Sequence, residues 1–204
     1  ATAKHYVAEG ATDHGLEGGN TTVSLEEVSS RVLPPYRIAV EEGVGAVMVA
    51  FNKMLGKSMH ANKQLVSDTL KGAMGFDGIV LTDWKGYSRF GGNAVINAGI
   101  DMGMAVDGDM DIFQQWLKEG VLQGEVPMSR IDDAVRRILR QKFRLGLFEN
   151  PFPDPQYIQM LGCQDHRDKA RLAVRESLVL LKSDRTTLPI DSKAGKIVVV
   201  GEHA

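Results

Sequence analysis

The sequence is poor in the features that mark several large classes of protein. Its 204 residues include one cysteine, Cys163, so no disulfide can form within the chain. No apolar run approaches the roughly 18 to 20 residues that a membrane-spanning helix needs. Lysine and arginine number 24 against 26 aspartates and glutamates, and no block of basic residues indicates nucleic acid binding. We therefore expect a globular protein with neither a membrane nor a nucleic acid as its partner.

Segments with the pattern of strands alternate along the chain with segments that have the pattern of helices. The expected strands lie at 5–9, 45–51, 78–82 and 100–106. The expected helices lie at 24–43, where Pro34 and Pro35 must bend or interrupt the helix, and at 62–75, 92–98, 109–123 and 128–145. This alternation is typical of an α/β fold with a parallel sheet and crossover helices.

The composition changes near 149–157, where three prolines occur within five residues. Such a stretch is typical of a semi-rigid connector, so we expect residues 1–148 to form one domain and 149–163 a linker. Residues 164–204 then begin a second domain with an amphipathic helix and a buried strand that starts at Lys196. Unpaired sheet edges would be left at both ends, so we expect an internal part of a larger enzyme rather than a complete small domain.

The segment 75–86, GFDGIVLTDWKG, carries the clearest chemical signal. Its apolar run is typical of a fully buried strand, whose interior does not tolerate an unpaired carboxylate, and Asp83 stands at the end of that run. Parallel α/β barrels place their reacting groups at this carboxyl end. A helix N-cap is the alternative role for an aspartate that closes a strand.

Six ordered blocks cover nearly the whole chain and resemble the retaining family 3 glycoside hydrolases, above all the exo-acting β-glucan glucohydrolases and β-glucosidases. The blocks are KHYVAEG, GAVMVAFN with GKSMHAN, GFDGIVLTDWKG, AGIDMGM, PMSRIDDAVRRILRQKFRLGLFENP and RESLVLLK. The resemblance implies the C-terminal half of a (β/α)8 TIM-like barrel, a linker, and the first helix and strand of an α/β sandwich domain. It also implies an extracellular or periplasmic location.

The resemblance further implies hydrolysis of terminal non-reducing β-D-glucosyl residues from β-glucans, cello-oligosaccharides or β-glucosides. Hydrolysis with retention of the anomeric configuration needs an ionised nucleophile and a protonated acid. Asp83 matches the family's nucleophile, and Trp84 resembles the aromatic wall for the adjoining sugar. Lys4 and His5 resemble the pair that bonds the hydroxyls of the terminal glucose, and Arg89 fits an arginine near the same pocket. Core packing of Trp84, and a surface Lys4 beside a core His5, are the alternatives.

Three departures from the family pattern affect the expected pocket. Phe51 stands where many members carry a tyrosine, so one hydroxyl donor is absent. The acidic loop residue of many relatives would fall at Gly18, with Glu17 one step away. The acid/base, a glutamate of the second domain in such enzymes, is expected beyond Ala204. The chain alone would then be catalytically incomplete.

A second branch of the family removes N-acetylglucosamine and uses an Asp-His pair as its acid/base, which Asp13 and His14 resemble. The Pro-Gly-His of that branch is replaced here by the residues at 7–9, Val-Ala-Glu. Solvated loop polarity is the alternative role for the pair. The N-acetylglucosaminidase hypothesis therefore stays open beside the glucosidase.

A possible calcium loop at Asp107, Asp109 and Asp111 does not meet the requirements of that motif. The glycine expected at the sixth position is Ile112, and the acidic residue expected at the twelfth is Lys118. We therefore expect neither a metal nor a cofactor.

Overall fold

A computed structural model describes residues 1–184 and 186–202. The chain divides into two compact units, Ala1–Pro151 and Phe152–Ala204, and each is described by itself. Within the described ranges, none of the helices is both long enough and apolar enough to cross a membrane.

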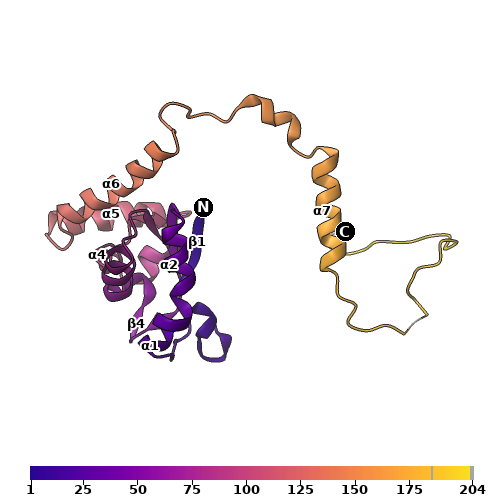
Figure 1. The fold of residues 1–204 in the computed structure, drawn as a ribbon, viewed down its shortest axis with the longest axis horizontal. Helices are drawn as coiled ribbons and strands as arrows, with labels where there is room; N and C mark the ends of the chain where they lie inside the picture. Colours follow the sequence, from indigo (N-terminus) through magenta and orange to yellow (C-terminus); the bar gives the residue numbers. More distant parts are fainter. Residues whose placement is uncertain (185, 203–204) are drawn as a thin grey trace. The chain divides into compact units, whose positions relative to one another are not determined.

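The first unit contains a four-stranded parallel sheet (Figure 1). Its strands are β1 (Thr2–Tyr6), β2 (Ala46–Val49), β5 (Ile79–Trp84) and β6 (Met102–Met104), and they lie side by side in that order. Ala46 lies opposite Thr2 on one side and opposite Ile79 on the other. Strands β3 (Lys53–Met54) and β4 (Lys57–Ser58) form a small separate hairpin. The prediction of a parallel α/β fold is confirmed.

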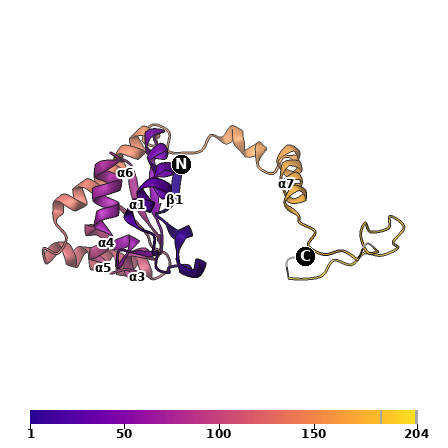
Figure 2. The same cartoon turned by 60° about the horizontal axis from the view of Figure 1, so that its bottom comes forward.

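Helical segments follow each strand of the sheet and complete its successive βα units. They are η1 (Glu9–Ala11), η2 (Asp13–Gly15), α1 (Leu25–Glu27), η3 (Val28–Val32) and α2 (Pro34–Glu41) after β1; η4 (Met59–Ala61) and η5 (Gln64–Ala73) before β5; α3 (Gly86–Arg89) and α4 (Asn93–Asn97) before β6; and α5 (Asp109–Leu122) and α6 (Met128–Arg144) after it. In both views the helices of this unit lie around the strands (Figures 1 and 2).

The helix expected at 24–43 is divided where the prolines predicted an interruption. Ser24 caps α1 by accepting a hydrogen bond from the backbone N–H of Glu27 at 3.1 Å. Pro34 begins α2, because a proline in the first turn of a helix removes no hydrogen bond. The core of the unit includes Val47, Val49 and Val80 of the central strands, Leu65, Val66 and Leu70 of η5, and Ile100 just before β6.

An enclosed ion-pair network lies at the amino end of the sheet. Asp101 directly precedes β6, and its side chain is completely buried. One of its oxygens accepts hydrogen bonds from Lys71 Nζ, at 2.7 Å, and from Arg130 on α6. The other accepts the backbone N–H of Val80 at 2.9 Å. The carboxylate therefore joins the sheet to α6 and η5.

Two more arginines of α6 continue this connection at seven-residue intervals. Arg137 donates to the carbonyls of Phe76 and Gly78, at 2.7 and 3.1 Å, just before β5 begins. Arg144 forms two hydrogen bonds with the carboxylate of Asp77, at 3.0 and 2.7 Å. Because a spacing of seven is close to two helical turns, these arginines share one helix face with Arg130.

The second unit contains the helices η6 (Pro155–Met160) and α7 (Gln164–Ser177). The strand predicted from Lys196 is wrong: residues 196–202 form no strand, and Ile197 and Val200 are 63% and 82% exposed. A strand needs a neighbour for its backbone hydrogen bonds, and the described residues of this unit contain none. The linker at 149–163 and the sandwich domain stay predictions.

Candidate active site

Asp83 is the last residue but one of β5, at the carboxyl end of the parallel sheet. The strand alternates between buried and accessible positions, so the buried side chain of Thr82 is followed by a partly accessible Asp83, 15% exposed at its side chain. Asp83 does not cap the following helix, because the residue before α3 is Lys85, at a φ of 53°, and it provides no side-chain cap. The carboxylate is therefore free for other contacts.

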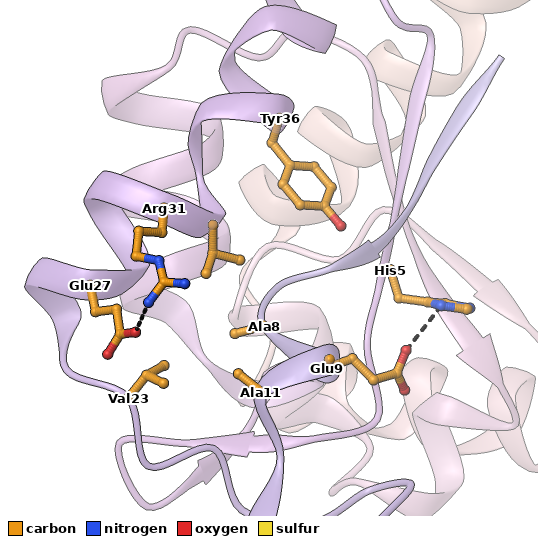
Figure 3. Close-up of a pocket in the computed structure, with 10 residues that line it drawn as sticks. His5, Ala8, Glu9, Ala11, Val23, Glu27, Arg31 and Tyr36 are labelled. Carbon is orange, nitrogen blue, oxygen red and sulfur yellow. Dashed lines mark hydrogen bonds and ion pairs between the residues drawn. The ribbon is translucent and has the colours of Figure 1, made fainter. Parts of the chain in front are cut away.

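The two carboxylate oxygens of Asp83 have different partners. Oδ1 accepts the backbone N–H of Trp84 at 2.6 Å, and Oδ2 lies 3.1 Å from Nε2 of His5. The other ring nitrogen of His5, Nδ1, lies 3.0 Å from a carboxylate oxygen of Glu9 (Figure 3). The imidazole of His5 therefore lies between the carboxylates of Asp83 and Glu9, with one ring nitrogen close to each.

Glu9 was not among the residues that we predicted for the site. It lies four residues after His5, in the short helix η1 that follows β1, and its spacing from the histidine was the available signal. The Lys4–His5 and Tyr6–Val7 peptide bonds in this part of the chain are cis.

An open cleft of about 460 Å³ lies over Asp83. It is lined by His5, Glu9, Thr12, Gly15, Leu16, Glu17, Phe51 and Asp83. Four of the residues predicted from the sequence therefore lie together, from three different segments of the chain. The combination of carboxylates, an imidazole and one aromatic ring suits the binding of a polar, uncharged molecule such as a sugar.

The other three predicted residues lie outside that lining. Lys4 is exposed, and Trp84 follows Asp83 directly with 52% of its surface accessible. The guanidinium of Arg89 packs over the rings of Phe51 and Phe90, with its carbon 4.6 and 5.3 Å from their centroids. In this structure Arg89 supports the wall of the cleft from behind Phe51.

A second hollow, of about 450 Å³, shares His5 and Glu9 with the cleft (Figure 3). Arg31 forms an ion pair with Glu27 at 2.7 Å on one side of it. The ring of Tyr36 points toward β1. Burial and the nearby charge of Glu9 raise the pKa of Tyr36 to about 12, so its hydroxyl stays protonated at neutral pH.

His60 contacts the backbone of Asp83, whereas His5 contacts its carboxylate, and His60 was also missed by the sequence analysis. Its Nε2 accepts the backbone N–H of Asp83 at 3.0 Å, and its side chain is completely enclosed. Nothing in the local sequence of η4 indicates this contact, because it depends on segments that lie 23 residues apart.

Asp13 and His14 are exposed in the loop after β1 and do not line the cleft over Asp83. Asp13 accepts a hydrogen bond from the hydroxyl of Thr22 at 3.0 Å, which is typical of loop polarity. Within residues 1–184 and 186–202, no three histidine, cysteine or acidic side chains gather in a way that could hold a metal ion. Asp109 and Asp111 lie in the first turn of α5, where acidic residues favour a helix.

Comparison with known proteins gives consistent results. Residues 1–141 match the family described as the glycosyl hydrolase family 3 N terminal domain. A periplasmic β-glucosidase of Salmonella typhimurium is 33% identical over 220 residues, which span 100% of this chain and 28% of that protein. A β-xylosidase of Formosa agariphila is 32% identical over 222 residues, or 100% of this chain and 31% of that one.

Solved structures agree with these relatives. The exo-1,3/1,4-β-glucanase of a Pseudoalteromonas species superposes with a TM-score of 0.79 and 41% identity, over 93% of this chain and 25% of that chain. The β-glucosidase of Listeria innocua in complex with glucose superposes with a TM-score of 0.76 and 33% identity, over 93% and 27%. The sequence thus spans about a quarter to a third of the relatives' length. The fold and the matched residues show that this chain belongs to glycosyl hydrolase family 3.

Proposed function

We propose that the protein containing this chain removes terminal β-D-glucosyl residues from β-glucans, cello-oligosaccharides or β-glucosides by a retaining mechanism in which Asp83 is the nucleophile. The observation that carries the proposal is the Asp83 carboxylate at the carboxyl end of β5, which accepts the backbone N–H of Trp84, lies 3.1 Å from Nε2 of His5 and faces an open cleft. An ionised carboxylate can only accept hydrogen bonds, and the backbone N–H of Trp84 is a donor to it.

The proposed reaction has two steps. Asp83 attacks the anomeric carbon of the terminal glucose, the bond to the leaving oxygen breaks, and a glucosyl ester of Asp83 forms. Water then attacks the anomeric carbon from the face that the leaving oxygen vacated, opposite Asp83, which breaks the ester bond and restores the carboxylate with net retention. A second carboxyl group about 5 to 5.5 Å away must protonate the leaving oxygen and activate the water. By resemblance to the family, we assign that group to a glutamate outside this chain.

The residues around Asp83 support specific roles in sugar binding. Glu17 lines the cleft and can accept a bond from a sugar hydroxyl, whereas Phe51 contributes a ring face and no donor. Both nitrogens of His5 already have carboxylate partners, so a sugar hydroxyl reaches His5 by exchanging with one of them. We propose that Lys4 bonds the same glucose, and that Trp84, half exposed beside Asp83, stacks on the adjoining sugar.

Two observations favour glucose as the terminal sugar. The relative with 41% identity is named as an exo-1,3/1,4-β-glucanase, and the Listeria innocua β-glucosidase was solved with glucose bound. The β-xylosidase among the relatives defines the sharpest competing substrate, since xylose lacks only the hydroxymethyl group of glucose. Comparing kcat/KM for the nitrophenyl β-glucoside, β-xyloside and N-acetyl-β-glucosaminide in the full-length protein separates the three.

Mass spectrometry after treatment with a 2-deoxy-2-fluoro-glucoside, which slows the second step, tests the nucleophile directly. We expect a fluoroglucosyl label within residues 75–86, assigned to Asp83 by fragmentation of the peptide. Asp77 lies in the same peptide but at the amino end of the strand, bonded to Arg144, so the Asp77→Asn variant should label normally. A label on any other residue would overturn the proposal.

A further inference from the structure

Strand β5 leaves the regular hydrogen-bonding pattern at the residue that carries the proposed nucleophile. The pairing of β5 with β6 shifts its register between Leu81 and Trp84. Within that interval the backbone N–H of Met104 donates to the hydroxyl of Thr82, at 2.7 Å. The backbone N–H of Asp83 donates to Nε2 of His60, at 3.0 Å. Two side chains therefore replace backbone acceptors where the strand ends.

The imidazole of His60 packs in a cluster with two phenylalanine rings, which also contact each other at a centroid distance of 5.8 Å. It stacks on Phe90, with ring centroids 4.6 Å apart and planes 16° apart, and on Phe51, at 5.7 Å and 24°. Gly86 closes the side next to Nε2, because a Cβ there would collide with Nε2 and Cδ2 of the ring. A close-packed ring of this kind has no room to turn its acceptor away from Asp83.

The ring is also kept neutral by its surroundings. Burial lowers the pKa of His60 to about 4; the carboxylate of Asp83 and the backbone of Ala50 oppose this effect, and Arg89 reinforces it. A neutral imidazole has one nitrogen with a proton and one without. Since Nε2 accepts from Asp83, the proton is on Nδ1.

We propose that His60 is a positioning residue for Asp83. Its buried Nε2 accepts the backbone N–H of Asp83, and this hydrogen bond fixes the direction in which the carboxylate points toward the sugar. The inference rests on the proposed role of Asp83 as nucleophile. The two histidines then have different roles, because His5 contacts the carboxylate of Asp83 and His60 contacts its backbone N–H. A small displacement of a reacting group is costly, so loss of this hydrogen bond should slow the chemical step.

The test compares two variants of the full-length protein. His60→Phe keeps an aromatic ring in contact with Phe51 and Phe90 but removes the acceptor, whereas His60→Gln supplies an amide oxygen near the position of Nε2. The measurement is the rate of covalent labelling of Asp83 by the 2-fluoro-glucoside, together with kcat and KM for a nitrophenyl glucoside. Ser58→Ala is the matched control, because Ser58 accepts the backbone N–H of His60 and leaves the imidazole unchanged.

We expect His60→Phe to lower the labelling rate and kcat by about tenfold to a hundredfold with little change in KM. His60→Gln should recover most of the loss, and Ser58→Ala should behave as the wild type. Labelling of His60→Phe at the wild-type rate would overturn the inference. If His60→Phe does not fold, His60→Gln decides, since a loss of labelling in that folded variant also overturns it. Absence of a label on Asp83 in the wild type would instead overturn the proposed function.

Discussion

The two ends of the parallel sheet each hold an aspartate, and the structure surrounds the two in different ways. Asp101, at the amino end, is fully enclosed and contacts Lys71, Arg130 and the backbone N–H of Val80. Asp83, at the carboxyl end, is 15% exposed, contacts one imidazole and one backbone N–H, and faces a cleft of about 460 Å³. One carboxylate is surrounded by cations and the other is open to a ligand.

This difference separates stability from chemistry within one sheet. A buried carboxylate with two cations and a backbone donor has its charge balanced, so removing it leaves buried positive charge. A carboxylate with few partners at the edge of a cleft keeps room for a new bond. In α/β barrels the carboxyl end of the strands carries the active site and the amino end contributes stability.

The largest expected effect is on activity, from Asp83→Asn in the full-length protein. Without an ionised nucleophile the first step fails, and kcat should fall on the order of 10⁴-fold or more. The urea midpoint should change little, because no buried cation loses its partner. Asp83→Gly with added azide should form the α-glucosyl azide, since the small anion attacks from the vacated side. A variant that keeps wild-type kcat would remove Asp83 from the mechanism.

The second prediction concerns the opposite end of the sheet. Asp101→Asn leaves Lys71 and Arg130 enclosed without their shared carboxylate, and we expect a loss of about 3 to 5 kcal/mol in the free energy of unfolding. Activity per folded molecule should remain. Asp133→Asn is the matched control, because its side chain is 41% exposed and belongs to the same network, so its loss should be smaller. An unchanged urea midpoint for Asp101→Asn would contradict the proposed division.

The third prediction concerns pH. Burial lowers the pKa of His60 to about 4 from a usual 6.5, so between these values the unfolded chain binds more protons than the folded one. Stability from this group is therefore complete above pH 6.5 and is lost as the pH falls toward 4, on the order of 3 kcal/mol in total. Urea midpoints measured across that range should fall less steeply for His60→Gln. Parallel curves for the two proteins would contradict the prediction.

The amino end should respond at lower pH. Burial raises the pKa of Asp133, but Lys71, Arg130 and Arg137 outweigh burial and lower it to about 2. A carboxyl group with a lowered pKa loses its contribution as the pH falls from 3.8 toward that value. As the pH falls, the contribution of His60 to stability should thus be lost first, at the carboxyl end, and that of Asp133 next, at the amino end.

A smaller effect is expected from Trp84→Ala. The indole is 52% exposed and follows Asp83, so its loss should weaken stacking on the adjoining sugar by roughly 0.5 to 1.5 kcal/mol. The value of kcat/KM should fall for β-1,3- and β-1,4-linked glucose disaccharides more than for a nitrophenyl glucoside. An equal fall for all substrates would place Trp84 in support of the first sugar or of the fold.

Local sequence patterns predicted the strands and the position of Asp83, which depend on neighbouring residues in the chain. Periodicity placed the four strands in order, and a carboxylate at the end of an apolar run placed Asp83 at the carboxyl end of β5. Its neighbours His5, Phe51 and Glu17 line one cleft, but they were named through family resemblance, because their positions depend on how separate loops pack.

The missed residues depend on tertiary contacts or on a spacing that we did not use. His60 acts through rings that are distant in sequence, so no local pattern marks it. The sequence analysis assigned no role to the arginines of α6, although Arg130, Arg137 and Arg144 recur every seven residues and bond the amino end of the sheet. The predicted strand at 196–200 is wrong because an apolar run specifies a strand only beside a partner.

The smallest expected effect comes from Asp77→Asn. Asp77 precedes β5 and forms two hydrogen bonds with Arg144, which lower the pKa of its carboxyl group, but both side chains are 53% exposed. An exposed ion pair of this kind contributes up to about 1 kcal/mol, and the carbonyl of Asp77 keeps its bond to Arg140 after the substitution. We expect a small fall in the urea midpoint and unchanged kcat. Asp77 and Asp83 lie at the two ends of one strand segment. If Asp77→Asn lowered kcat as much as Asp83→Asn, the integrity of this segment, and not the carboxylate of Asp83, would control the reaction.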